Sequence, residues 1–460
     1  MKRILYEDLE TALKAREAKI AVLGQGYIGL PTSLLMARAG FTVYGFDVNR
    51  NLIDELSRGE TRLKQEKGIA ELLDELKERN YFPTGDLSEL YGSDVVLIAV
   101  PTPKGRDGPN LSMVLSALES ALEIVRRGGL IVIESTLPPR TFYDLIIPTV
   151  ESRGLKVGKD VYLAYCPERA LPGKLLQELV QNFRIIGAVD EKSGLLAKTL
   201  YESFVEGGIE IVDPLTAEMV KLVENSYRDV NIAFANEVAR MCEVLGVDVR
   251  KVRELANKHP RVNMLIPGIG VGGSCLTKDP WFLFWASQER GYRPNLIKRA
   301  RELNAEMPFH YADILDEVVR QLRGGRSGVI AVLGSTYKGD VPDPRESPVE
   351  PFVKELVKRG HAVKVYDPLV RSPFGGEYVP DMLEAVKDAD AIAFVTDHTE
   401  FKMLDLRKLR RAVKKDGPVI LFDGRLLFDP EEAEEAGFTY ISVGRPYTTI
   451  LERSLVTIED

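Results

Sequence analysis

Short apolar runs, each followed by glycine or by an acidic residue, occur in two widely separated parts of the chain. Near the N-terminus, the apolar run Ile20–Leu23 predicts a strand that is buried on both faces, as in a parallel sheet. A glycine-rich turn, a helix over about 30–39 and a second strand over 42–46 are predicted to follow it. This order of elements is typical of a doubly wound α/β fold.

The turn after the first strand has the composition of a dinucleotide-binding loop. Gly24, Gly26 and Gly29 stand at G-x-G-x-x-G spacing, and Asp47 ends the second strand. The first glycine allows a tight turn, the second lets a pyrophosphate approach the backbone, and the third lets the helix pack on the strand. An acid at this distance can accept hydrogen bonds from a ribose diol. The glycines alone would more often mark an ordinary turn, but together with strand, helix and acid they predict dinucleotide binding.

The same pattern returns near the other end of the chain. GVIAVLGSTYKG (328–339) repeats the AVLG of 21–24, VKVYDP (363–368) matches VYGFDV (43–48), and DAIAFVTDHTE (390–400) resembles DVVLIAVPTP (94–103). In this second unit Ser335 and Thr336 follow Gly334, so the middle glycine is missing. Two interpretations stay open: a different phosphate ligand held by Lys338, or a purely structural copy.

Between the two units, Pro214 and Pro260 bracket 45 residues without proline, and apolar positions at helical spacing as far as Leu245 predict one long helix. Asp213 and Pro214 suit an N-cap followed by proline at the first helical position, and Gly246 is expected to end the helix. A helix of about 30 residues is about 45 Å long. We expect it to join the two nucleotide-binding domains and to offer a surface to a partner subunit. A short helix is also predicted over about 4–16.

Composition narrows the class of protein. The chain has 460 residues, a net charge of −8, 45% hydrophobic residues and three cysteines. No apolar run reaches the roughly 20 residues of a membrane span, and the N-terminus lacks the apolar core of a signal peptide. The acidic balance argues against a nucleic-acid partner. The three cysteines and four histidines have no metal-ligand spacing. We therefore expect a cytoplasmic, multidomain protein without a bound metal and without nucleic-acid or membrane partners.

Cys275 is the strongest candidate for chemistry. It follows Gly268, Gly270, Gly272 and Gly273 and precedes the charged pair Lys278-Asp279. A free cysteine is most often a buried structural residue, but this surrounding favours a reactive thiol. Cys242 lies in an apolar helical pattern and is interpreted as core, and nothing assigns chemistry to Cys166. On the long helix, Lys221 and Asn225 share one face, which on spacing alone favours a solvated polar stripe.

Ten motifs, in order, carry a resemblance to a known family. They are GQGYIGLP, FDVN, VPTP, ESTLPPRT, CPERALPGK, AEMVKLVENSYRDVNIAFANE, HPRVNMLIPGIGVGGSCLTKDP, STYKGDVPDPRESP, YDP and FDGR. Over about residues 19–445 the chain resembles the UDP-glucose/GDP-mannose dehydrogenases. PERALPGK and GVGGSC with DPWF most resemble the UDP-N-acetylmannosamine dehydrogenase branch, and the UDP-N-acetylglucosamine dehydrogenases come next.

The resemblance and the repeated pattern together predict a fold with two Rossmann-like, doubly wound parallel-sheet domains, joined by a long central helix and a small helical domain. The expected segments are an N-terminal helix (1–17), an NAD-binding domain (18–212), a central helical and dimerisation domain (213–310) and a UDP-sugar-binding domain (311–460). The implied reaction is NAD-dependent, four-electron oxidation of the C6 hydroxyl of a UDP-sugar, with UDP-N-acetylmannosamine as the expected substrate, to the uronate.

The resemblance also implies roles for individual residues. Cys275 matches the nucleophile that carries the sugar as thiohemiacetal and thioester, and Lys221 and Asn225 match the pair that stabilises the developing oxyanion. Asp279 matches the carboxylate that positions these groups and water. Thr136 and Glu168 complete the implied catalytic set, with Glu168 in thioester hydrolysis. The implied NAD-binding residues are Gly24, Gly26, Tyr27, Ile28, Gly29, Asp47, Thr102, Lys278 and Arg345. The implied substrate-binding residues are Arg261, Gly272, Gly273, Lys338 and Arg425, with Arg261 reaching across a homodimer.

Two departures from the family pattern matter. UDP-glucose dehydrogenases carry a second glutamate four residues after the first, and Pro172 stands there in this chain, which argues against UDP-glucose. A position that is often basic in the family is Leu52, and Arg50 is the candidate to replace it. Alternative functions are oxidation of UDP-N-acetylglucosamine or UDP-glucose, a two-electron hydroxyacid dehydrogenase, and a catalytically idle NAD-binding protein.

Overall fold

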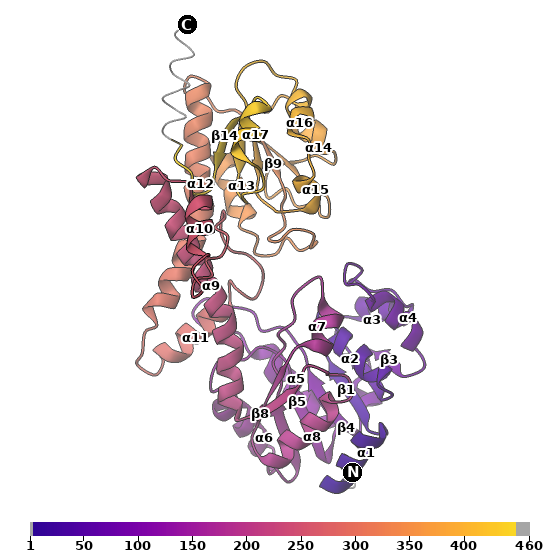
Figure 1. The fold of residues 1–460 in the computed structure, drawn as a ribbon. Helices are drawn as coiled ribbons and strands as arrows, with labels where there is room; N and C mark the ends of the chain where they lie inside the picture. The colour runs from indigo at the N-terminus through magenta and orange to yellow at the C-terminus, as the bar shows by residue number, and fades with distance from the viewer. Residues whose placement is uncertain (1–2, 448–460) are drawn as a thin grey trace. The chain divides into compact units, whose positions relative to one another are not determined.

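The computed structural model describes residues 3–447, which divide into two compact units. The first unit contains the chain up to residue 224 together with 282–292, and the second contains 225–281 together with the chain from residue 293 onward. Each unit is built on its own parallel or mostly parallel sheet (Figure 1). The two predicted Rossmann-like domains are therefore confirmed, whereas the exact domain boundaries stay a prediction.

The sheet of the first unit has eight strands in the order β3-β2-β1-β4-β5-β6-β7-β8. They are β1 (Lys19–Leu23), β2 (Thr42–Phe46), β3 (Tyr81–Thr84), β4 (Ser93–Ile98), β5 (Val125–Ile133), β6 (Val161–Tyr165), β7 (Arg184–Ala188) and β8 (Ile209–Val212). All neighbours are parallel except β6 and β7. The chain reverses direction across the sheet between β1 and β4, and such a switch point places ligands at the carboxyl ends of these two strands.

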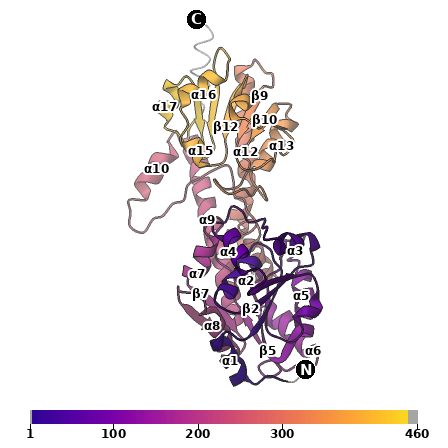
Figure 2. The same ribbon diagram turned by 90° about the vertical axis from the view of Figure 1, so that its right-hand side faces the viewer.

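Helices cover both faces of this sheet (Figure 2). They are α1 (Tyr6–Ala15), α2 (Gly29–Arg38), α3 (Arg50–Ser57), α4 (Ile69–Leu76), α5 (Ser112–Ile124), α6 (Ile147–Ser152), α7 (Leu175–Gln181) and α8 (Glu191–Tyr201), with single turns η1 (Leu87–Leu90) and η2 (Phe142–Ile146). Ile20 and Val22 of β1 belong to the core with α1, α2 and α8, whereas Ala21 and Leu23 belong to the core with α5 and α6. Alternate side chains of one strand are thus buried on opposite faces, which confirms the strand predicted from its continuous apolar run.

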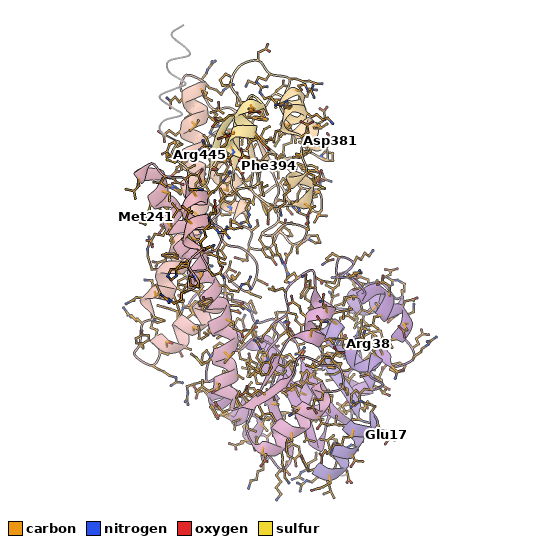
Figure 3. All side chains as sticks on the ribbon, in the orientation of Figure 1. Glu17, Arg38, Met241, Asp381, Phe394 and Arg445 are labelled. Atoms are coloured by element: carbon orange, nitrogen blue, oxygen red, sulfur yellow. The ribbon has the colours of Figure 1, made fainter. Side chains whose placement is uncertain are left out.

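The second unit repeats this design in a six-stranded, all-parallel sheet of order β11-β10-β9-β12-β13-β14. Its strands are β9 (Val329–Leu333), β10 (Ala362–Tyr366), β11 (Glu377–Tyr378), β12 (Ala391–Phe394), β13 (Ile420–Asp423) and β14 (Thr439–Ser442). Its covering helices are α12 (Asn295–Leu322), α13 (Val349–Lys358), α14 (Met382–Val386), α15 (Thr399–Lys402), α16 (Leu406–Ala412) and α17 (Pro430–Glu435). Phe394, labelled in Figure 3, packs edge-to-face on Phe401 and Phe428 at the centre of one layer. The strand order equals that of the first six strands of the other sheet, so the repeat read in the sequence is a repeat of structure.

The long predicted helix is α9 (Pro214–Leu245), with 32 residues. The backbone N–H of Thr216 donates to Asp213 Oδ1 at 3.0 Å, so Asp213 caps the helix as predicted. Gly246, with a φ of +80°, follows the last turn. Two further helices, α10 (Val249–Ala256) and α11 (Asp279–Gln288), complete the set. None of the helices within residues 3–447 combines the length and the apolar character that a bilayer crossing requires.

Candidate active site

The three glycines of the turn after β1 differ in whether the fold leaves space for a side chain. Gly24 has a φ of +93°, and a Cβ there would lie 2.5 Å from the carbonyl oxygen of Ala99. A Cβ on Gly29 would lie 1.8 Å from the carbonyl oxygen of Gly24. A Cβ on Gly26 would meet no atom within 4 Å. The fold itself therefore requires two of the glycines, whereas Gly26 faces the open space beside Ile28, the residue that precedes α2, where a pyrophosphate can approach the helix N-terminus.

Asp47 lies at the carboxyl end of β2, beside this turn. Its Oδ2 accepts the backbone N–H of Gln25, and its Oδ1 accepts that of Asn49, both at 2.9 Å. The residue is only partly buried. A carboxylate offers about four acceptor positions, so Asp47 retains capacity for two hydroxyl groups of a ribose. The residues of this turn fit a dinucleotide.

The equivalent acid of the second unit, Asp367, has no such capacity. It is 3% exposed, and it accepts backbone N–H groups of Ser335, Thr336, Leu369 and Val370. His398 Nδ1 accepts the N–H of Asp340, which leaves Nε2 as the protonated nitrogen, 3.2 Å from Asp367 Oδ2. With its oxygens used inside the fold, Asp367 does not serve a ribose. The second unit therefore lacks the acid that distinguishes a dinucleotide site.

Thr102 and Thr136 lie on neighbouring loops at the carboxyl edge of the first sheet. Ser135 joins these loops, since its hydroxyl accepts the N–H of Val100 at 2.9 Å and donates to the carbonyl of Val100 at 2.7 Å. Thr102 is 4% exposed, and Thr136 is partly buried. The structure thus brings a predicted cofactor residue and a predicted catalytic residue to the same edge.

Glu168 begins the loop after β6, and its carboxylate is engaged on both oxygens. Oε1 accepts the backbone N–H groups of Arg169 and Ala170, both at 2.6 Å. Oε2 lies 3.2 Å from Nη2 of the buried Arg184. This arrangement holds the loop in shape and pairs the carboxylate with Arg184, while Oε2 accepts no hydrogen bond from the described residues 3–447.

The other end of the same loop is fixed by Glu66, which is 2% exposed. Its carboxylate accepts the N–H groups of Gly173 at 2.8 Å and Leu175 at 3.2 Å, and also the hydroxyl of Tyr27. Pro172, which stands where UDP-glucose dehydrogenases carry an acid, therefore lies beside a loop segment that a distant carboxylate holds. Tyr27 connects this loop to the glycine turn.

Buried titratable groups lie beneath the Glu168 loop. The thiol of Cys166 accepts a hydrogen bond from Arg184 at 3.7 Å, and burial raises the pKa of this thiol to about 11. Tyr201 donates its hydroxyl to Glu134 Oε1 at 2.6 Å. Burial raises the pKa of Glu134 to about 7, and the charge of Arg184 opposes this rise. Cys166 is therefore an inert core thiol, whereas Glu134 titrates near neutral pH.

The N-terminal half of α9 is polar and buried. Lys221 and Asn225 are each 8% exposed, so the solvated stripe favoured by their spacing alone is wrong. Glu218, fully buried one turn before Lys221, accepts the N–H groups of Arg140 at 2.6 Å and Phe142 at 2.9 Å. Burial raises the pKa of Glu218 to about 7. Glu218 thus ties the segment that follows Thr136 to the helix that carries Lys221.

In the second unit, Cys275 starts the turn that leads into α11. Cys275 is exposed, and its carbonyl accepts the N–H groups of Lys278 at 3.1 Å and Asp279 at 2.8 Å. The Asp279 side chain is fully buried, and its Oδ2 accepts the Asn225 amide at 2.7 Å. Lys278 Nζ lies 3.8 Å from Asp279 Oδ1. Three residues that the sequence placed in one mechanism, Cys275, Asn225 and Asp279, therefore meet in space.

Gly272 lies against the Cβ atom of Tyr337, and Gly273 lies against its ring. A Cβ on either residue would approach a Tyr337 atom to 2.5 Å or 2.8 Å. Burial raises the pKa of Tyr337 to about 12, and the charges of Asp343 and Cys275 act in the same direction. The absence of side chains on these glycines thus serves close packing, and their role as substrate contacts stays a prediction.

The predicted cationic residues of the second unit are spread over several loops. Arg345 is exposed and forms an ion pair with Asp343 at 2.7 Å. Arg425 lies 3.4 Å from Asp397, whose Oδ1 also accepts the N–H of Gly339, the residue that follows Lys338. Lys338 and Arg425 thus share the edge formed by the carboxyl ends of the strands. Arg261 is exposed after α10, and its predicted reach into another subunit is not tested by one chain.

Several supporting residues were not found by sequence reasoning. Glu66, Arg184 and Glu218 lie far along the chain from the loops that they hold, and no motif marks them. A weak signal existed for Arg184, a charged residue at the start of the apolar strand RIIGA, and for Asp229, four residues after Asn225 on the same helix face. Within residues 3–447 no group of three or more His, Cys, Asp or Glu side chains is arranged to hold a metal ion.

Three domains of the UDP-glucose/GDP-mannose dehydrogenase family match the chain: the NAD binding domain at 18–205, the central domain at 215–306 and the UDP binding domain at 331–430. The UDP-N-acetyl-D-mannosamine dehydrogenase of Methanocaldococcus jannaschii is 41% identical over 434 residues, 93% of this chain and 96% of that protein. The NDP-N-acetyl-D-galactosaminuronic acid dehydrogenase of Ralstonia solanacearum is 36% identical over 420 residues, 89% and 97% of the two chains. The solved structure of the UDP-D-ManNAc dehydrogenase from Pyrococcus horikoshii has a TM-score of 0.86 at 40% identity, covering 93% and 99%.

Gly26→Ala tests the space beside the glycine turn. Because a Cβ at this position meets no protein atom, we expect the thermal unfolding midpoint to stay at the wild-type value. The same methyl group occupies the approach of the pyrophosphate, so we expect the Kd for NAD to rise about tenfold or more. Titration calorimetry measures it. Gly108→Ala, also in open space, is the matched control, and unchanged NAD affinity in Gly26→Ala would contradict the assignment.

Glu134→Gln tests the buried carboxyl. The folded-state pKa of about 7 exceeds the ordinary value of 4.5, so the contribution of Glu134 to stability is full below pH 4.5 and is lost as pH rises through 7. Glutamine keeps the acceptor for Tyr201 but does not titrate. Between pH 5 and pH 8 we expect the free energy of unfolding of the wild type to fall by on the order of 2 kcal/mol more than that of the variant. The thermal unfolding midpoint of the wild type is expected to fall more steeply as a result. The exposed Glu151→Gln is the control, and parallel profiles of wild type and Glu134→Gln would refute the prediction.

Proposed function

The chain belongs to the UDP-glucose/GDP-mannose dehydrogenase family, and from this premise we propose that it oxidises the C6 hydroxyl of UDP-N-acetylmannosamine to the uronate in two steps. It is an NAD-dependent nucleotide-sugar dehydrogenase, and so an oxidoreductase. Beyond the family membership, we propose the identity of the sugar, the covalent chemistry and the residues that perform it.

The observation that carries the proposal is the contact between Asn225 and Asp279. These residues are 54 positions apart, and the 2.7 Å hydrogen bond between their buried side chains joins the long helix to the turn that begins at Cys275. A buried carboxylate that holds an amide beside an exposed thiol is an arrangement suited to covalent catalysis. It also gives Asn225 a defined orientation, which a solvated polar residue would lack.

We assign the chemical steps as follows. NAD, held at the glycine turn and Asp47, would supply the acceptor for the hydride that leaves C6. Cys275 then adds its sulfur to the C6 aldehyde, which forms a C–S bond while the thiol proton passes to the aldehyde oxygen. The thiohemiacetal keeps the sugar in the site until a second NAD, exchanged for the NADH, would take the remaining C6 hydride and leave a thioester. Lys221 and Asn225 stabilise the oxygen that carries negative charge, and such donors in a site without water contribute several kcal/mol, about 3 per donor. Asp279 holds Asn225, and water releases the uronate and regenerates the thiol.

We assign the remaining residue roles from the positions that match the family motifs. We propose that Thr136 and Glu168 act in the catalytic site. Gly24, Gly26, Tyr27, Ile28, Gly29, Asp47, Thr102, Lys278 and Arg345 are proposed to bind NAD, and Arg261, Gly272, Gly273, Lys338 and Arg425 to bind the UDP-sugar. A nucleophilic thiol requires a reducing compartment, so we place the reaction in the cytoplasm.

The choice of sugar rests on the loop after β6. Pro172 removes an acid from this loop, and Glu66 fixes the backbone beside it through Gly173 and Leu175. A loop without that second carboxylate suits a neutral N-acetyl group, which needs room and a hydrogen-bond partner. Relatives named for N-acetylated sugars support this choice at 36–41% identity. UDP-N-acetylglucosamine and UDP-glucose are the alternative substrates.

We also propose a homodimer. Tyr227, Phe234 and Met241 of α9 stand seven residues apart and are 67%, 56% and 51% exposed, and Leu245 is 70% exposed (Figure 3 labels Met241). Apolar side chains repeated every seven residues along a helix form a seam that packs against a second helix. A second copy of the chain would cover this seam and would present Arg261 to the partner's sugar site.

A panel of UDP-sugars tests the proposed reaction. We expect two NADH per UDP-N-acetylmannosamine consumed, and much weaker oxidation of UDP-glucose. Cys275→Ser is expected to bind NAD and the UDP-sugar normally but to lower the overall oxidation by about 100-fold or more, because a serine hydroxyl is a poor nucleophile. Absorbance of NADH and mass spectrometry of the protein measure both.

Cys242→Ser, the same change at a buried cysteine of α9, is the matched control and is expected to keep the native stoichiometry. Two NADH per sugar at the native rate in Cys275→Ser would exclude covalent catalysis by this residue. Activity on UDP-glucose alone would overturn the choice of sugar, and a single NADH from a hydroxyacid would favour a two-electron dehydrogenase. NAD binding without any turnover across the panel would favour a non-catalytic protein.

Phe234→Glu tests the dimer. A charge in the middle of the apolar seam is expected to convert the protein to a monomer, measured by light scattering, and to weaken binding of the UDP-sugar because Arg261 no longer reaches a partner. Binding of NAD alone is expected to stay unchanged. Met403→Glu, at an apolar residue that is 76% exposed outside α9, is the control. A wild-type protein that is fully active as a monomer would sink this proposal.

A further inference from the structure

The segment 268–276, which leads to Cys275, is held at both ends by buried side chains of α9 and α12. At its start, the backbone N–H of Gly268 donates to Asn236 Oδ1 at 2.9 Å. At its end, Nη1 of Arg301 donates to the carbonyl oxygen of Leu276 at 3.0 Å. Arg301 is 5% exposed, and the bond from its guanidinium is made to the residue that follows the thiol.

Asp229 neutralises this buried cation. Arg301 Nη1 lies 2.6 Å from Asp229 Oδ1, and Asp229 is fully buried. Asn304 Nδ2 donates to the same oxygen at 2.8 Å, and Asn304 Oδ1 accepts a hydrogen bond from Asn236 Nδ2 at 2.9 Å. The two anchors of the segment are therefore parts of one buried network that runs from Gly268 to Leu276.

The network matters because the Cys275 thiol is only weakly held by its own side-chain contacts: the Ser274 hydroxyl lies 4.0 Å from its sulfur. The Cys275 side chain is exposed, so packing does not orient it. Its backbone is fixed instead: the Cys275 carbonyl accepts N–H groups of the turn into α11, and the next carbonyl, that of Leu276, accepts Arg301. With two successive carbonyls held, the Cα–Cβ bond of Cys275 has a defined direction. Correct placement of a reacting atom within about 1 Å is worth a large factor in rate.

We propose that Arg301, held by Asp229, is a positioning residue that aims the Cys275 thiol through the carbonyl of Leu276. The inference rests on the proposed function only for the carbon atom that the thiol attacks. The contacts of Arg301 with Asp229 and Leu276 do not depend on that function. It assigns no contact with substrate or cofactor to Arg301. Its effect is confined to the steps in which the thiol takes part, so the first oxidation, which precedes attack by the thiol, does not depend on it.

Two variants separate positioning from stability. Arg301→Met alone leaves Asp229 as a buried, unpaired charge, so this protein is expected to be strongly destabilised. Arg301→Met combined with Asp229→Asn removes both charges, and we expect its unfolding midpoint to return close to the wild-type value. The double variant still lacks a donor to the Leu276 carbonyl. Arg299→Met, at an exposed arginine of the same helix, is the matched control and is expected to behave as the wild type.

The decisive readout is the split between the two oxidations, measured with UDP-N-acetylmannosamine. In the double variant we expect the first NADH of a single turnover to form within about twofold of the wild-type rate. We expect the overall turnover to fall at least about tenfold, and aldehyde to escape into a hydroxylamine trap. Native overall turnover in the double variant, or an equal loss in both oxidations, would overturn the proposal.

A second measurement keeps the inference separate from the proposed function. If the wild type forms no NADH with any UDP-sugar, the proposed function fails, and alkylation of Cys275 by iodoacetamide still tests Arg301. The rate in the double variant is expected to differ from that of the wild type by at least about threefold, with Arg299→Met unchanged. Equal alkylation rates in all three proteins would overturn the positioning role.

Discussion

The feature on which the rest of the structure depends is the polar, buried face of α9. Glu218, Asn225, Asp229, Asn236 and Glu243 all lie at or below 8% exposure. A buried polar group without a partner costs about 1–3 kcal/mol, and an unpaired buried charge costs more. Each of these side chains must therefore find a partner, and each finds it on a different segment of the chain.

Those partners include the segments to which we assign the proposed chemistry and the segments that support them. Within the first unit, Glu218 holds the backbone of Arg140 and Phe142 beyond Thr136. Within the second unit, Asn225 holds Asp279, Asp229 holds Arg301, and Asn236 holds Gly268. Glu243 accepts the Tyr311 hydroxyl and the N–H of Gly444, and so fixes the end of the second sheet to the helix. One helix thus acts as a template, because the cost of burying its polar face is offset only when every segment is in its place.

The two sheets show how far a sequence repeat predicts function. Strand order and the hydrogen bond from the turn to the acid are common to both, since the N–H of Gln25 donates to Asp47 and the N–H of Ser335 donates to Asp367. The strands and the glycine turn could be predicted because their signals are local: apolar runs, G-x-G-x-x-G and an acid at a strand end. Three features could not be predicted, because each depends on residues that only the fold brings together. They are the burial of Lys221 and Asn225, the pairing of Glu168 with Arg184, and the hydrogen bond between His398 and Asp367. The missing middle glycine of the second unit was the one sequence signal of that difference.

The buried carboxyls that shape the site also set its response to pH. Burial raises the pKa of Glu134 and Glu218 to about 7 and that of Asp229 to about 6, against an opposing effect of Arg301 on Asp229. Each raised value means that folding is favoured while the carboxyl is protonated, and that this advantage disappears as pH rises through the folded-state pKa. For Asp229, ionisation also strengthens the pair with Arg301, so the same proton whose loss costs folding energy leaves a carboxylate that holds Arg301 against the Leu276 carbonyl.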